Sequence, residues 1–124
     1  MPHSSHLVLC IDDEQVGLRV RKILLERAGY EVVTALDGVA GLEIFATQPV
    51  AAVVLDYSMP GMHGGEVARR MRLIKPDVPI LLLSAYVGLT SEITSLVDLY
   101  MTKGEGPPVL LQKLRTLLPL VTAS

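Results

Sequence analysis

Short apolar runs alternate along this chain with longer segments in which apolar residues recur every three or four positions. The runs have the length of β-strands and no helical period, and they cover residues 7–11, 31–34, 51–55, 79–83 and 99–102. The longer segments have the period of amphipathic helices and cover residues 14–28, 37–48, 64–74, 90–97 and 107–118. This alternation predicts an α/β fold, a parallel sheet with helices on both faces and right-handed crossovers.

Capping and turn residues agree with these boundaries. Gly29 follows the first helical segment and suits the residue that ends a helix, whereas Asp37 is expected to cap the second helix. Pro107 or Pro108 suits the first turn of the last helix. In the first helix one apolar stripe, of the kind that usually packs on a core, contains Val16, Val20, Ile23 and Leu24.

The composition limits the class of protein and its expected location in the cell. The chain has 124 residues, half of them hydrophobic, which suits one domain with a buried core. No apolar stretch approaches the roughly 20 residues of a membrane span, and the first residues do not resemble a signal peptide. The net charge of -2 gives no electrostatic reason to bind nucleic acid or an anionic membrane. The single Cys10 cannot form an internal disulfide and suits a core position, so we expect a cytoplasmic protein.

Reactive side chains follow four of the predicted strands, at the point where each strand ends. They are Asp12 and Asp13, then Asp56, Ser84 and Lys103. Carboxyl ends of parallel strands meet at one edge of a sheet, where open α/β folds bind ligands. Clustered carboxylates repel one another and favour a hard cation such as Mg²⁺, while an ammonium can pair with a carboxylate or a phosphoryl oxygen. Singly, each residue could be a helix cap, a turn residue or a surface charge; together they indicate a site.

The segments IDDE, LDYSMPGMHGGE and YMTK, with the strand-end Ser84, carry a family resemblance. Over residues 7–118 the chain resembles the receiver domain of bacterial two-component response regulators, of the chemotaxis-regulator type. The resemblance implies a flavodoxin-like (βα)5 fold, a doubly wound five-stranded parallel sheet with five helices and strand order 2-1-3-4-5. Residues 1–6 would then be a disordered N-terminus and residues 119–124 a C-terminal tail.

The resemblance also assigns the acidic residues. It makes Asp56 the phosphoacceptor and Asp13 a direct ligand of Mg²⁺. Asp12 would act mostly through a metal-bound water, and Ser58 would offer its backbone carbonyl to the metal.

The remaining family roles concern the signal rather than the metal. Lys103 would neutralise charge on the phosphoryl group, and Ser84 would be the hydroxyl that moves onto it. Tyr100 matches the aromatic residue that turns inward when this hydroxyl moves. The residues expected to line the approach of water are Tyr57, Ser58, Ala85 and Tyr86.

The implied function is to take a phosphoryl group from a sensor histidine kinase or a phosphotransfer protein and to switch a partner-binding face. That face would consist of the fourth helix, the fifth strand and the fifth helix. Such a domain is no enzyme beyond its own phosphorylation and dephosphorylation. An unidentified downstream protein or fused output domain would receive the signal, and a phosphorylation-dependent homodimer stays open. We expect no direct binding to nucleic acid or membrane.

Three other functions compete with this one. A degenerate receiver would bind partners without phosphate control, which the five reactive residues argue against. A phosphatase with Asp56 as nucleophile usually needs a carboxylate two residues later, where this chain has Ser58. A flavodoxin-like cofactor binder would need a phosphate loop after the first strand, where this chain has Asp-Asp-Glu.

Two departures from the family pattern concern the predicted partner-binding face. Lys103 is followed by Gly104 rather than proline, so we expect a trans peptide bond and a turn made by the freedom of Gly104. Lys103 comes 19 positions after Ser84, about one helical turn fewer than usual. The fourth helix should therefore be short, and the partner or dimer mode non-standard. We expect His63 to be a solvated loop residue.

Overall fold

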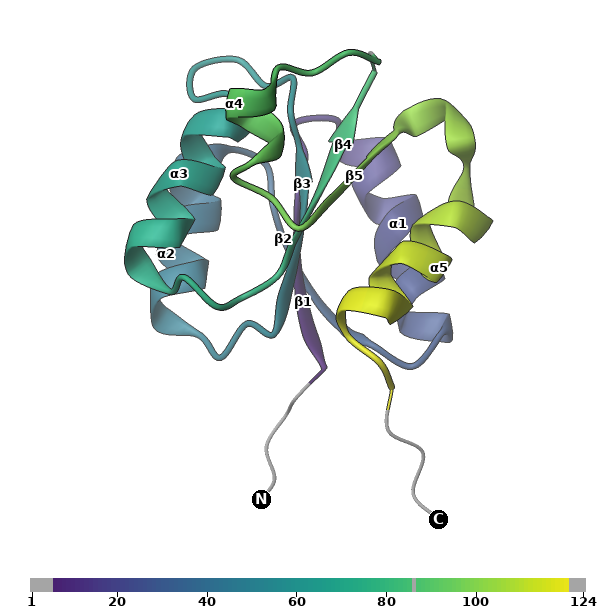
Figure 1. Cartoon of the computed structure of the whole chain (residues 1–124). Coiled ribbons are helices and arrows are strands. Elements are labelled where there is room, and N and C mark those ends of the chain that lie inside the picture. Colours follow the sequence, from purple (N-terminus) through teal and green to yellow (C-terminus); the bar gives the residue numbers. More distant parts are fainter. Residues whose placement is uncertain (1–5, 86, 121–124) are drawn as a thin grey trace.

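A parallel five-stranded sheet lies between two layers of helices in the computed structural model, which describes residues 6–85 and 87–120 (Figure 1). The strands are β1 (Leu7–Ile11), β2 (Glu31–Ala35), β3 (Ala52–Asp56), β4 (Ile80–Ser84) and β5 (Leu99–Thr102). The helices are α1 (Gln15–Arg27), α2 (Gly38–Thr47), α3 (Gly64–Ile74), α4 (Ser91–Thr94) and α5 (Pro107–Leu117). The strand order is β2-β1-β3-β4-β5, and the predicted architecture is confirmed.

The core has two halves because alternate strand residues point to opposite faces of the sheet. On one face α2, α3 and α4 cover a cluster that includes Ile11, Leu55 and Phe45. On the other, α1 and α5 cover a cluster that includes Val54 and Cys10. The central strands β3 and β4 are buried throughout, as expected for strands covered on both faces. Cys10 is a core residue, and burial raises the pKa of its thiol to about 12.

The orientation of α1 corrects the prediction for its apolar stripe. The buried residues of the helix are Leu18 and Leu25, whereas Val16 is 75% exposed and Val20 58% exposed. With 3.6 residues per turn, Val16 and Val20 lie nearly opposite Leu18 on the helix. The sequence period was helical, but the larger part of the apolar stripe faces away from the sheet.

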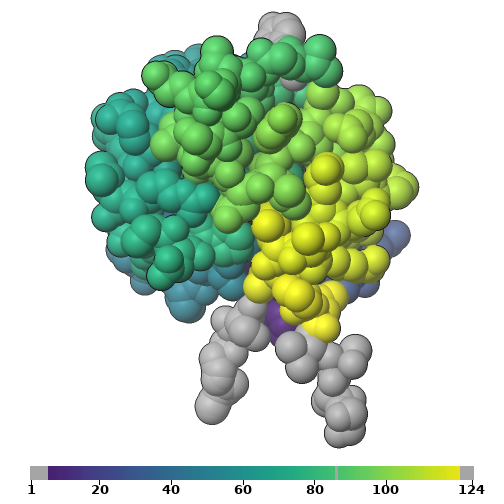
Figure 2. All heavy atoms as spheres, in the orientation of Figure 1, coloured from purple at the N-terminus to yellow at the C-terminus, as the bar shows by residue number. Residues whose placement is uncertain are grey.

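The fourth helix is as short as the spacing predicted. It comprises the four residues Ser91–Thr94, and the Thr90 hydroxyl caps it by accepting a hydrogen bond from Ile93 N. Turn residues then lead directly into β5. Figure 2 shows that α4 with its flanking loops and the β5–α5 segment form one continuous surface.

The connection from β5 to α5 is built differently from the prediction. The part of the chain that the structure describes contains no cis peptide bond, so the bond after Lys103 is trans. Gly104, however, does not supply the turn, since the positive φ of 87° belongs to Gly106. A 3-10 turn over Lys103–Glu105 makes the connection, and Thr102 N donates a 2.8 Å hydrogen bond to Glu105 Oε2.

One residue on each side of the predicted domain 7–118 has a contact in the fold. His6 O accepts a hydrogen bond from Glu31 N, and Leu120 packs against the core beside α1 and α5. The described residues do not include residues 1–5, Tyr86 or residues 121–124. Most of the predicted disordered N-terminus, the predicted lining role of Tyr86 and most of the predicted C-terminal tail therefore lie outside them. Within the described ranges, no helix is both long and apolar enough to cross a membrane.

Candidate functional site

Four parallel strands deliver polar side chains to one edge of the sheet. Asp12 follows β1, Asp56 ends β3, Ser84 ends β4, and Lys103 follows β5. Asp12, Asp56 and Ser84 are buried, although each is polar. Apolar runs that stop at a polar residue therefore place these groups together, as the sequence predicted.

The carboxylates of Asp12, Asp13 and Asp56 form a cluster. Each offers an oxygen, and these oxygens lie within 4.8 Å of one another. Asp13 is the exposed member, so it faces the open side of the cluster. Carboxylate oxygens are the ligands that Mg²⁺ prefers in proteins, and the donor set therefore fits this ion.

Lys103 connects two of these carboxylates. Its Nζ lies 3.1 Å from Asp56 Oδ1 and 3.5 Å from Asp12 Oδ2. The contact with Asp56 is an ion pair without hydrogen-bond geometry, and Oδ1 has no hydrogen-bond partner among the described residues. A buried oxygen of this kind is available to a further partner.

Opposite pKa shifts distinguish the two buried aspartates. Burial raises the pKa of Asp56 to about 6, with Lys103 opposing and the Asp12 charge adding to the rise. Burial also acts on Asp12, but there the hydrogen bond from Glu14 N and the charges of Lys103 and Arg21 outweigh it and lower the pKa. The pKa of Lys103 is raised, because its carboxylate partners outweigh its burial. Asp12 is thus the firmly ionised member, and Asp56 the one whose charge the fold disfavours.

The start of α3 packs directly on the end of β3. Gly64 N donates a 2.8 Å hydrogen bond to Tyr57 O, and a β-carbon at Gly64 would lie 2.6 Å from the main-chain oxygen of Asp56. Only a residue without a side chain fits there. The first glycine of the Gly-Gly pair in the LDYSMPGMHGGE segment therefore brings the first turn of α3 against the backbone of Asp56.

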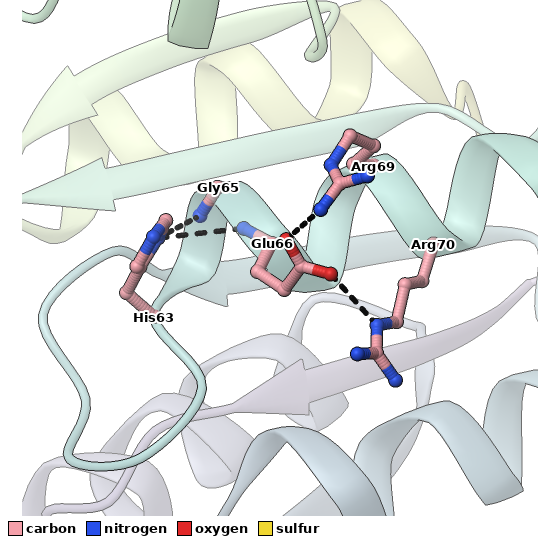
Figure 3. Close-up of polar contacts among 5 residues, drawn as sticks. All are labelled: His63, Gly65, Glu66, Arg69 and Arg70. Carbon is pink, nitrogen blue, oxygen red and sulfur yellow. Dashed lines mark hydrogen bonds and ion pairs between the residues drawn. The ribbon is translucent and has the colours of Figure 1, made fainter.

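His63 is exposed and lies in the loop before α3, as expected of a solvated loop residue, and it also has a structural role. It is the N-cap of α3, and its Nδ1 accepts hydrogen bonds from Gly65 N at 3.1 Å and Glu66 N at 3.4 Å (Figure 3). Glu66 in turn pairs with Arg69 and Arg70 along the helix. Histidine is not among the residues that commonly cap helices, so this role is hard to predict from residue type alone.

Arg21 is the site residue that the sequence analysis missed. It reaches from α1 to the carboxylate of Asp12, with Nη1 3.1 Å from Oδ2. Helical side chains lean toward the helix N-terminus, and this direction brings Arg21 back toward the residue that precedes α1. An arginine two to three turns after the Asp-Asp pair was the available signal.

The residues assigned to switching lie at the β4–β5 side of the site. Ser84 pairs with Thr102 in the sheet register, and Leu82 pairs with Tyr100. The Tyr100 side chain is 53% exposed and lines a surface pocket together with Val87 and Leu89. Tyr100 therefore adopts the outward position in this structure. Ser58 and Ala85 are exposed beside the site, and Tyr57 is half-buried.

Comparisons with known proteins show which family the chain resembles. The response regulator receiver domain family matches residues 8–115. The probable transcriptional regulator ycf27 of Cyanophora paradoxa is 38% identical over 114 residues, which cover 90% of this chain and 47% of that protein. Response regulator MprA of a Mycobacterium species is 35% identical over 90% of this chain and 50% of its own length. The chain thus spans about half the length of these relatives.

Solved structures show the same fold. Response regulator TrrA of Thermotoga maritima, solved with Mg²⁺ and BeF, has a TM-score of 0.86 and 35% identity over 91% of this chain and 99% of its own. Chemotaxis protein CheY4 of Vibrio cholerae has a TM-score of 0.86 and 28% identity over 93% of this chain and 100% of its own. The chain belongs to the receiver domain family of two-component response regulators.

Proposed function

We propose that this domain accepts a phosphoryl group on Asp56 in a reaction that requires Mg²⁺. The observation that carries the proposal is the ion pair between Asp56 and Lys103 at 3.1 Å, beside three carboxylates whose oxygens converge within 4.8 Å. The similar response regulator TrrA was solved in complex with Mg²⁺ and BeF, which supports a role for this metal in the present domain. The donor would be the phosphohistidine of a sensor kinase or a phosphotransfer protein.

Each residue would have a separate part in this transfer. An oxygen of Asp56 forms the new bond to phosphorus as the bond from phosphorus to the histidine nitrogen breaks. Asp13, Asp56 and the Ser58 carbonyl would hold the ion directly, and Asp12 through water. The metal supplies positive charge to the transferring group, which needs positioning and charge neutralisation more than covalent activation. Lys103 would pass from the carboxylate to a phosphoryl oxygen.

The phosphorylated state would then be read at the α4–β5–α5 surface. Ser84 would move toward the phosphoryl group, and Tyr100, now exposed, would turn inward. Because α4 has only four residues, the surface offered to a partner differs from one with a long fourth helix. We infer a downstream protein or a fused output domain as receiver of the signal, with a homodimer as the alternative and no direct contact with nucleic acid or membrane. A kinase partner of this kind implies action in the cytoplasm.

Intact mass measurement tests the proposal. Wild type and two variants are incubated with Mg²⁺ and a small acyl phosphate: Asp56→Asn, and Asp77→Asn as a control at an exposed aspartate. We expect one added phosphoryl group on wild type and on Asp77→Asn, and none on Asp56→Asn or after chelation of the metal. An adduct on Asp56→Asn would show that another residue is the acceptor. A wild type that stays unmodified would make the domain an interaction module without phosphate control.

A further inference from the structure

Arg21 brings a second positive charge into contact with the carboxylate cluster. Its Nη1 lies 3.1 Å from Asp12 Oδ2, and its side chain is only 13% exposed. Lys103 contacts the same oxygen from β5 at 3.5 Å. Asp12 therefore has two cations in contact with it, one from α1 and one from the β5–α5 connection, and Asp56 shares the second of them.

The Arg21 side chain runs past Gly17 toward the cluster. Gly17 lies one turn before Arg21, and a β-carbon there would be 3.8 Å from Arg21 Nη2 and 3.1 Å from Glu14 Oε1. A β-carbon at this position would crowd Glu14, whereas it would only touch the guanidinium at van der Waals distance. Arg21 also lines the pocket between α1 and α5 that contains Lys103 and Met101, so its stem follows an apolar wall.

Both carboxylate oxygens of Asp12 have partners. Oδ1 accepts the hydrogen bond from Glu14 N at 2.9 Å, and Oδ2 faces Arg21 and Lys103. A carboxylate held from both sides has a fixed orientation. Its charge is partly neutralised before any metal arrives, and a cation that binds beside it must compete with the guanidinium.

We propose that Arg21 is a positioning residue that serves as resident counter-ion of Asp12. It holds the acidic cluster together in the metal-free protein and weakens the binding of Mg²⁺ to the same cluster. The inference rests on the proposed function in that it takes this cluster as the metal site. By weakening Mg²⁺ binding, Arg21 would raise the Mg²⁺ concentration that phosphorylation of the domain requires.

Charge and hydrogen bonding can be separated by the choice of variant. Arg21→Gln keeps a polar side chain that can donate to Asp12 but removes the charge, and Arg21→Lys keeps the charge. Arg19→Gln is the matched control, because it removes the same charge from an exposed position of the same helix. A long-range effect of net charge would appear equally in Arg19→Gln and Arg21→Gln.

Titration calorimetry with MgCl2 and thermal unfolding measure the effect without any phosphoryl donor. We expect Arg21→Gln to bind Mg²⁺ about 3- to 10-fold more tightly than wild type, and Arg21→Lys and Arg19→Gln to stay within about twofold. Metal-free Arg21→Gln should melt below wild type and gain more in Tm from Mg²⁺.

The outcomes separate this inference from the proposed function. Equal Mg²⁺ affinity in wild type and Arg21→Gln would overturn the counter-ion role and leave phosphorylation of Asp56 standing. Weaker binding in Arg21→Gln would instead make Arg21 a support of the metal site. If neither protein bound Mg²⁺, both the metal site and the counter-ion role would be wrong.

Discussion

A β-carbon at Gly64 would lie 2.6 Å from the main-chain oxygen of Asp56 and 2.7 Å from the Cα of Tyr57. Both neighbours are backbone atoms of the segment that carries the candidate phosphoacceptor, so a side chain at Gly64 cannot be accommodated by a rotamer change. The α3 N-terminus and the end of β3 are therefore a single packed unit, and the position of Asp56 depends on a residue eight positions later.

Gly64→Ala should destabilise the fold by about 2–4 kcal/mol and reduce phosphorylation of Asp56, because relief of the clash must displace the β3–α3 segment. Urea unfolding and intact mass after treatment with an acyl phosphate measure the two effects. Gly104→Ala is the control, since a β-carbon there meets no atom within 4 Å and the residue has no positive φ. A Gly64→Ala variant with the stability of Gly104→Ala would contradict the packing argument.

The raised pKa of Asp56 predicts that its buried charge lowers the free energy of unfolding in a pH-dependent way. The folded-state pKa of about 6 exceeds that of an unfolded aspartate, so the folded state binds the proton more tightly. The free energy of unfolding should then fall as pH rises through the window from about 4 to 6. Asp56→Asn removes this charge and should exceed wild type in stability by about 1–3 kcal/mol at pH 8.

Urea unfolding of metal-free protein at pH 4, 6 and 8 measures this difference. The gap between Asp56→Asn and wild type should close near pH 4, where wild-type Asp56 is protonated. Asp77→Asn, at an exposed position, should track wild type across the series. A gap of constant size from pH 4 to pH 8 would mean that Asp56 titrates like an unfolded aspartate.

Asp12 should behave in the opposite way. Its pKa is lowered, so its contribution to stability is present above the unfolded pKa and is lost as pH falls through the folded pKa. Asp12→Asn would leave Arg21 without its carboxylate partner and should destabilise the protein by about 1–3 kcal/mol at pH 7. Urea unfolding of wild type and Asp12→Asn at pH 7, 5 and 3 measures it. The loss should shrink toward pH 3, and a stabilised Asp12→Asn at pH 7 would contradict the role of the ion pairs.

Much of the sheet and of the acidic cluster was predictable because strand ends are visible in the sequence. Each of β1, β3 and β4 is a continuous apolar run that stops at or beside a polar residue, and parallel topology then fixes where these residues meet. The proximity of Asp12, Asp13 and Asp56 follows from the order of the strands and helices along the chain and from the residue types at the strand ends. It requires no knowledge of side-chain conformation.

Features that depend on how a helix is rotated about its own axis could not be predicted from the order of apolar and polar residues. The periodic signal of α1 came mostly from Val16 and Val20, which are exposed, so it located the helix but not its buried face. The contact of Arg21 with Asp12 requires a particular rotation of α1, which periodicity does not provide. The turn after Lys103 was assigned to Gly104, whereas Gly106 and the Thr102–Glu105 contact form it.

The last prediction concerns the histidine that begins α3. His63 Nδ1 accepts from Gly65 N, a main-chain donor that a helix start leaves open, and from Glu66 N, which also donates to His63 O (Figure 3). His63→Ala should cost about 1 kcal/mol of unfolding free energy, as the loss of other N-caps does. His63→Asn should retain most of it, because the asparagine side-chain oxygen is a good cap.

Urea unfolding of the two His63 variants gives the comparison directly, and phosphorylation kinetics give a second one. Because α3 begins against the backbone of Asp56, a frayed first turn should slow the modification of Asp56 in His63→Ala more than in His63→Asn. Equal stability of the alanine and asparagine variants would show that the cap contributes little. Slow modification in both variants at unchanged stability would instead indicate that the imidazole itself acts near the phosphoryl group, beyond its place at the helix start.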